Sequence, residues 1–190
     1  AVMAFPGTAN AQVQPLTVEY PFTGTSHIAG VNDDLELGPG TMRASLNLQT
    51  GDATADVELP PVQGEFDAIG FIPTTVTTTF IEEGQSTAFV DPRGGATTAW
   101  SNMTIQLSNL KVLGIPLLIG SHCKTETPVQ LTLNSQPGWS VLTGGTLAGT
   151  YSIPDFENCL LNTWLINSMI PGDGNTITLN LSTPTVIPPG

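Results

Sequence analysis

The feature that most constrains the fold is an alternation of apolar and polar residues, which is clearest in segment 44–59. On both sides of a turn at 49–52, every second residue is apolar, namely Ala44, Leu46, Leu48, Ala53, Ala55, Val57 and Leu59. A period of two places these side chains on one face of a β-strand, and Gly51 supplies the positive φ that a hairpin loop needs. The segment therefore predicts a β-hairpin with one buried face.

Strands of the same kind are expected along the whole chain, at 14–20, 23–31, 65–72, 74–81, 119–123, 129–133, 139–141, 146–153 and 175–182. Pro21 is expected to separate the first two, because proline cannot donate a ladder hydrogen bond. Short strands separated by regular turns, without alternating helices, exclude a parallel sheet. We predict an all-β fold: an antiparallel β-sandwich or barrel of about ten strands, with one C-terminal helix packed on it.

The helix is expected in a strand–helix–strand element at 146–182. Asp155 follows a proline at the place of an N-cap, and Pro171 is a stop signal. Between them, apolar residues recur at helical spacing, at Phe156, Leu160, Trp164 and Met169. We expect this helix to cover the β-structure as a lid.

Residues 12–190 are predicted to form a single domain, which carries signs of an internal repeat between 40–83 and 84–134. A shift of 44 positions aligns Ala44 with Ala88 and Gly51 with Gly95. It also brings together two apolar turns, FDAIGFIP at 66–73 and LKVLGIP at 110–116. The alternative is a chance match, since alternating strands and small residues align easily.

Charge excludes several partners. The net charge is −12, from 16 acidic residues against four basic ones. So few cations cannot neutralise a nucleic-acid backbone or hold an anionic membrane surface. The apolar run at 112–120 is too short for a transmembrane segment. The two histidines and two cysteines lack the spacing of a zinc site, and no phosphate-binding glycine loop is present, so no metal or cofactor is expected.

The N-terminal segment and the cysteine pair indicate export. Ala9-Asn10-Ala11 follows a short apolar run, so residues 1–11 are interpreted as a signal-peptide remnant or a disordered leader. In an exported chain the two cysteines, Cys123 and Cys159, most simply form a disulfide, the alternative being two inert thiols. We therefore expect a secreted protein, extracellular or associated with the cell wall.

Several segments resemble a group of exported cell-envelope proteins of actinobacteria. They are LNLQTGDATADVELPP, LKVLGIPL, HCKTETPVQLTL and the tail GTYSIPDFENCLLNTW, and the resemblance covers most of the chain from about Thr23. The cysteines occupy corresponding places, but the glycine that these relatives carry beside the second cysteine is absent. The resemblance implies export and an all-β fold. The group has no established activity.

Three functions remain as hypotheses. The first is a pocket for a lipid or another apolar molecule between the two apolar turns and the helix, lined by Phe71, Ile72, Leu113, Ile115, Leu117, Trp164, Leu165 and Met169. The alternative for these residues is an ordinary core beneath the helix. The second function is assembly or adhesion at the cell surface, by self-association through edge strands. The third is a glycan-acting hydrolase with an acidic pair. Because no nucleophile motif is present, we expect a non-catalytic protein.

Overall fold

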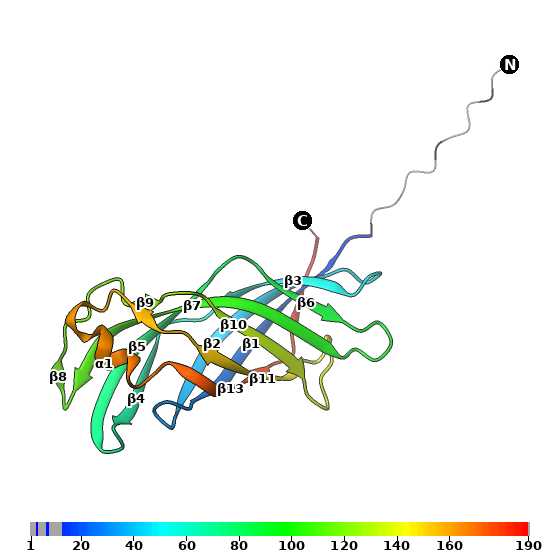
Figure 1. Ribbon diagram of the computed structural model, residues 1–190. Helices are drawn as coiled ribbons and strands as arrows, with labels where there is room; N and C mark the ends of the chain where they lie inside the picture. The colour runs from blue at the N-terminus through cyan, green and yellow to red at the C-terminus, as the bar shows by residue number, and fades with distance from the viewer. Residues whose placement is uncertain (1–2, 4–6, 8–12, 190) are drawn as a thin grey trace.

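A computed structural model describes residues 3, 7 and 13–189 (Figure 1). The predicted leader, 1–11, lies outside the described residues apart from Met3 and Gly7. The elements are β1 (Leu16–Ile28), β2 (Asp33–Leu46), β3 (Asp52–Glu58), β4 (Val62–Ala68), β5 (Ile72–Glu82), β6 (Ser86–Val90), β7 (Thr97–Val112), β8 (Ile115–Pro116), β9 (Lys124–Thr125), β10 (Val129–Ser135), β11 (Gly145–Ile153), β12 (Phe156–Glu157), η1 (Leu160–Asn162), α1 (Thr163–Asn167), β13 (Gly172–Leu181) and β14 (Thr185–Ile187). The predicted all-β class is confirmed.

Eight of the strands close into an antiparallel barrel. Their order is β1-β2-β3-β6-β7-β10-β11-β13, and β13 pairs again with β1. The closing pair β7–β10 runs from Met103 opposite Val129 to Thr98 opposite Asn134. Closure removes the free edges of these strands, and it decides between the two predicted architectures in favour of the barrel.

The long strand β7 carries the chain beyond the barrel. Its first part pairs with β6 and β10, and from Met103 onward it pairs with β5, which in turn pairs with β4. The short strands β8 and β9 also pair with this second part of β7. In Figure 1 the β4–β5 hairpin, β8 and α1 lie together at the left end of the molecule.

The hairpin predicted from the alternation is β2–β3. Ala44 pairs with Ala55 and Leu46 with Ala53, and the predicted apolar face of these strands faces the barrel interior. The expectation for Leu48 is wrong. It lies in the turn and is exposed, because β2 ends at Leu46.

Pro21 does not end a strand as predicted. It lies inside β1, opposite Thr41 of β2, and its carbonyl accepts a hydrogen bond from Ser182 N–H. The β1–β2 register shifts between Phe22 and Gly24, directly after the proline. Proline is tolerated at such irregularities because a regular ladder donor is not needed there.

The predicted C-terminal helix is present, but it is much shorter than predicted. The α-helix covers only Thr163–Asn167, and its N-cap residue is Asn162 rather than Asp155. Phe156 and Glu157, expected in the helix, form β12 and pair with β9. Asn158 and Leu160 have φ of 59° and 56°, a left-handed conformation that interrupts a right-handed helix. The apolar residues at helical spacing therefore do not share one buried face.

The predicted disulfide between Cys123 and Cys159 is present, and both cysteines are fully buried. It joins the segment after β8 to the segment before η1. No helix in the described part of the chain is long and apolar enough to cross a bilayer.

The path of paired strands ends at β4, a seven-residue strand that exposes Glu65 and Asp67. Charges on an edge strand oppose pairing with another chain. Self-association through edge strands stays a prediction, and so does the internal repeat.

Candidate functional site

The barrel interior is lined by a row of small side chains. The paired residues Ala53 on β3, Ala88 on β6 and Ala99 on β7 follow one another around the wall, between Leu46 on β2 and Leu133 on β10. An eight-stranded barrel has an interior that large side chains just fill. Three consecutive alanines therefore leave space in it.

A cavity of about 120 Å³ occupies this space, and we call it the lumen cavity. Every barrel strand contributes to its lining, for example Val18, Ala44, Ala55, Ala88, Ala99, Leu133, Leu147 and Leu181. Met42, Leu131 and Trp139 line it and stay only half-buried, although they belong to the core. An engineered apolar cavity of about 150 Å³ takes up benzene or xenon, so the lumen cavity has the size of a small hydrocarbon.

The buried polar side-chain atoms around the lumen cavity have hydrogen-bond partners within the protein. Ser26 Oγ lies 2.6 Å from the Tyr151 hydroxyl and donates to the Thr176 carbonyl at 3.0 Å. The Tyr20 hydroxyl donates to the Val141 carbonyl. Among the described residues that are not exposed, no buried side-chain nitrogen or oxygen lacks a partner. The lumen cavity therefore offers a ligand mainly apolar contact.

The lumen is also uncharged at neutral pH. Burial raises the pKa of Tyr20 to about 12. Burial likewise raises the pKa of Tyr151, and the hydrogen bond with Ser26 lowers it in part. Both phenols stay neutral, which suits a hydrocarbon and excludes a bound charge.

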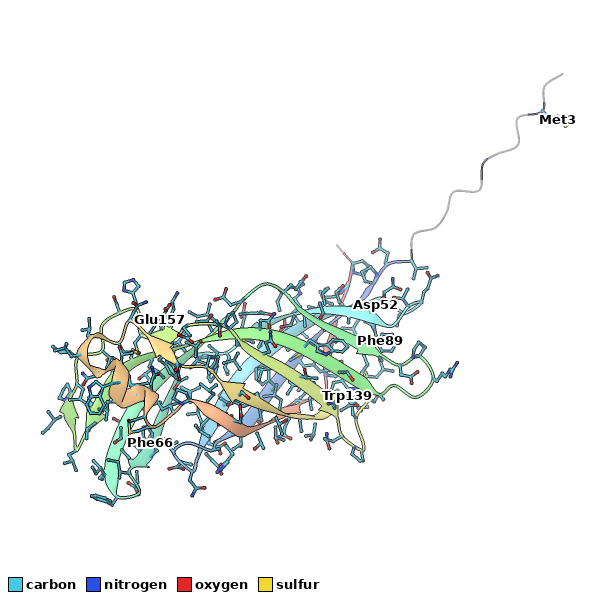
Figure 2. All side chains as sticks on the ribbon, in the orientation of Figure 1. Met3, Asp52, Phe66, Phe89, Trp139 and Glu157 are labelled. Carbon is cyan, nitrogen blue, oxygen red and sulfur yellow. A yellow bond between two sulfur atoms is a disulfide. The ribbon has the colours of Figure 1, made fainter. Side chains whose placement is uncertain are left out.

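Trp139 covers the lumen from the loop between β10 and β11. Its Nε1–H donates to Thr97 Oγ1 at 2.8 Å, and its ring lies 6.0 Å from the Tyr20 ring between centroids. The Tyr20 bond to Val141 holds the same loop. Figure 2 shows Trp139 far from Phe66, which marks the other end of the molecule. Trp139 thus stands as a plug at one end of the lumen.

A second, smaller cavity of about 60 Å³ lies between the barrel and the β4–β5 hairpin. Phe80, Ile105 and Tyr151 line both cavities and separate them. Tyr151 also lines a polar surface groove beside β10 and β11. Tyr151 therefore lies next to both cavities and to the groove.

The eight residues that the sequence predicted as a ligand pocket lie elsewhere. None of them lines either cavity. Four are exposed, namely Phe71, Leu113, Ile115 and Trp164, and four are half-buried, namely Ile72, Leu117, Leu165 and Met169. The turns and α1 lie at the same end of the molecule, as predicted, but they form an outer surface there. Their ligand-binding role stays a prediction and now concerns that surface.

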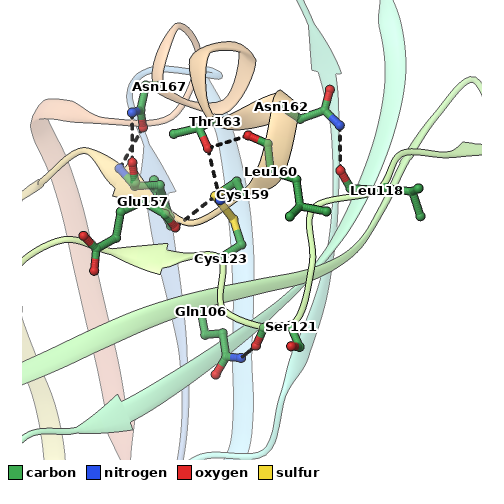
Figure 3. The surroundings of a disulfide bond; sticks show 11 residues. Gln106, Leu118, Ser121, Cys123, Glu157, Cys159, Leu160, Asn162, Thr163 and Asn167 are labelled. Carbon is green, nitrogen blue, oxygen red and sulfur yellow. Dashed lines mark hydrogen bonds between the residues drawn. A yellow bond between two sulfur atoms is a disulfide. The ribbon is translucent and has the colours of Figure 1, made fainter.

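The disulfide lies at the base of this surface, and hydrogen bonds around it hold two segments together (Figure 3). Asn162 Nδ2 donates to the Leu118 carbonyl at 2.7 Å. Asn167 accepts from Phe156 N–H through Oδ1 and donates to the Phe156 carbonyl through Nδ2. The two segments are therefore fixed before any partner arrives.

The histidines and acids form no recognisable catalytic set. His27 pairs with Asp34 at 2.7 Å on the surface, and His122 contacts Ser121 beside the disulfide. The described residues hold no group of three metal-ligating side chains. Glu83 and Asp173 share the polar groove, where Thr104 and Ser152 donate to them. The glycan-acting hypothesis stays a prediction.

Sequence reasoning missed the lumen as a site. It placed Ala44, Ala53 and Ala55 on the inner face, but it gave their small size no meaning. The usable signal was alanine at inward positions where leucine or valine is usual in a strand. Trp139 was expected in a strand at 139–141, but that segment lies in the loop between β10 and β11, and the strand expected at 119–123 is likewise a loop. No protein-family model, curated protein or solved structure matches the chain.

Proposed function

We propose that this protein binds a small apolar molecule, or one end of a lipid chain, in the lumen of its barrel. The observation that carries the proposal is the lumen cavity, with its row of alanines and its internally satisfied polar atoms. Leaving about 120 Å³ unfilled costs stability, about 3 kcal/mol at ~24 cal/mol per Å³. A ligand that fills the space recovers part of that free energy.

The ligand class follows from the lining. Because the lumen is uncharged and its polar atoms are paired, a charged or polar headgroup would lose hydrogen bonds to water and gain none. Such a headgroup would have to stay at the barrel end, near Trp139, or in the polar groove beside Tyr151. The interior suits hydrocarbon, either aliphatic or aromatic.

The proposed setting is outside the cytoplasm, and the proposed role is non-catalytic. The disulfide supports export, because such bonds persist mainly in oxidising compartments. The resemblance to exported actinobacterial proteins agrees with it. Holding an apolar molecule in an aqueous compartment requires a closed wall, which the barrel supplies.

A filled-lumen variant tests the proposal. Ala88→Leu adds three carbons inside the alanine row, next to Ala53 and Ala99. Thr132→Leu, on the exposed face of the barrel strand β10 and outside the cavity lining, is the matched control. We expect titration calorimetry to show that benzene binds the wild type and Thr132→Leu alike and loses at least tenfold in affinity for Ala88→Leu. Equal binding by a folded Ala88→Leu protein would place the probe elsewhere and contradict the proposal.

A further inference from the structure

The end of the molecule opposite Trp139 exposes a cluster of large apolar side chains. We call it the apolar tip and define it as Ile69, Phe71, Leu113, Ile115, Leu118, Leu160, Leu161 and Trp164. Each of these eight is at least 60% exposed, and they are half of the sixteen exposed large apolar side chains in the described part of the chain. Single exposed apolar residues are ordinary, but a cluster marks a contact surface.

The cluster is continuous because its segments touch. Leu113 N–H donates to the Pro73 carbonyl, which joins the β7–β8 turn to the start of β5. The bond from Asn162 to Leu118 joins the loop after β8 to η1, and Leu160 lies against Gly120. The disulfide fixes the same junction (Figure 3). A rigid apolar surface loses little entropy on binding.

The backbone holds several of these side chains outward at a conformational cost. Six non-glycine residues in the described chain have positive φ. Three are asparagines, which tolerate this conformation, and the other three are Ile69, Leu113 and Leu160, all in the tip and all exposed. Hairpin loops of this kind normally carry Asn, Asp or Gly. Ile69, Leu113 and Leu160 gain little from packing there because all three are exposed, so their large side chains call for another explanation.

The distribution of charge along the chain indicates which kind of partner fits the tip. The tip segments 66–75, 109–123 and 158–171 contain one acid, Asp67, and one basic residue, Lys111, so their formal charge is zero. The other 15 of the 16 acids lie outside these segments, so the rest of the chain carries the whole net charge of −12. An anionic membrane would repel this acidic body, whereas a zwitterionic lipid surface would not.

Shape favours lipid over protein. The tip side chains sit on turns, on the two-residue strand β8 and on a short helical segment, and none of them lines the lumen cavity, the second cavity or the polar groove. A protein partner would need a matching apolar hollow, whereas lipid adapts to protruding side chains. The exposed Trp164 has the amphipathic ring that is enriched at the membrane interface.

We propose that the apolar tip docks on an electrically neutral lipid surface. The side chains of the two apolar turns and of segment 160–164 insert into the lipid, while the barrel stays in water. This inference does not depend on a ligand in the lumen. If both proposals hold, the protein would stand on a lipid surface with its apolar cavity turned away from it.

The test measures binding to phosphatidylcholine vesicles by flotation. The double variant Ile69→Asn with Leu113→Asn removes two apolar side chains and inserts the residue type that suits the backbone there. We expect its vesicle binding to fall at least tenfold while its melting temperature stays equal or rises, which no structural defect would produce. Leu142→Asn, an exposed leucine near Trp139, is the control and is expected to bind like the wild type.

Other results would overturn the proposal. Absence of wild-type binding to phosphatidylcholine would do so, as would stronger binding to vesicles that contain phosphatidylserine. A concentration-dependent dimer that the double variant abolishes would assign the tip to a second copy of this chain. Ala88→Leu should float like the wild type, so failure of the lumen proposal and failure of the tip proposal are distinguishable.

Discussion

Apolar residues form both the lumen and the apolar tip, but their side chains point inward in the lumen and outward at the tip. In the lumen, a closed wall turns small side chains inward and leaves space between them. At the tip, turns project large side chains outward and leave them uncovered. The comparison teaches that apolar sequence alone does not locate a binding site. What matters is residue size where the chain is buried and backbone conformation where it is exposed.

The two regions also differ in what fixes them. The lumen depends on strand register and on a few hydrogen bonds, which Tyr20 makes to the Val141 carbonyl and Ser26 makes to Tyr151. The tip depends on one disulfide and on side chains that bond to backbone groups of a neighbouring loop. Perturbing one region should therefore leave the other intact.

Removing the disulfide should have the largest effect. The double variant Cys123→Ala with Cys159→Ala is expected to lower the free energy of unfolding by about 3–4 kcal/mol, because a cross-link restricts the unfolded chain. Thermal unfolding would show a melting temperature lower by roughly 10 °C. Binding of benzene by the folded variant should persist. Loss of that binding would mean that the tip and the lumen are coupled.

Alkaline pH should destabilise the lumen selectively. Burial raises the pKa of Tyr20 to about 12 in the folded protein, above its unfolded value near 10, so folding favours the neutral phenol. That stability is complete below pH 10 and is lost as pH rises through 12, by about 2 kcal/mol. The tip has no tyrosine, since Tyr20 and Tyr151 are the only two in the chain. Urea unfolding at pH 9 and 11 measures the change, and Tyr20→Phe should show less of it. An equal loss in Tyr20→Phe would assign the effect to other groups.

Changing side-chain size should have opposite results in the two regions. Ala88→Leu fills empty space and is expected to raise the free energy of unfolding by about 1 kcal/mol. Leu161→Ala, at a residue 89% exposed, should change it by less than about 0.5 kcal/mol. Chemical denaturation compares them directly. Strong destabilisation by Ala88→Leu would show that the side chains of the barrel wall already fill the lumen.

Substitutions at residues with positive φ should have the smallest effect on the free energy of unfolding. Leu113→Asn is expected to stabilise the protein by about 0.5–1 kcal/mol, because asparagine adopts this conformation at lower cost. Asn109→Leu, at the neighbouring left-handed position of β7, should destabilise it by a similar amount. If both changes are neutral, the backbone cost at the tip is negligible and the argument from conformation fails.

The sequence predicts the fold class well because strand periodicity is a local signal. The β2–β3 hairpin and the Cys123–Cys159 bond follow from it and from the cysteine count. Barrel closure depends on the pairing of β7 with β10, which no local pattern encodes. The C-terminal helix is shorter than predicted because Asn158 and Leu160 have a left-handed backbone conformation, although the apolar spacing around them is helical. The lumen cavity was not predicted because an unfilled space depends on the side chains of eight strands together and not on any one segment.

The central claim is that the lumen holds an apolar molecule, and native mass spectrometry after expression in an actinobacterial host tests it most directly. The account predicts an added mass on the wild type and on Thr132→Leu that organic extraction removes and that Ala88→Leu lacks. A wild-type protein that carries no added mass and takes up no benzene would contradict the claim.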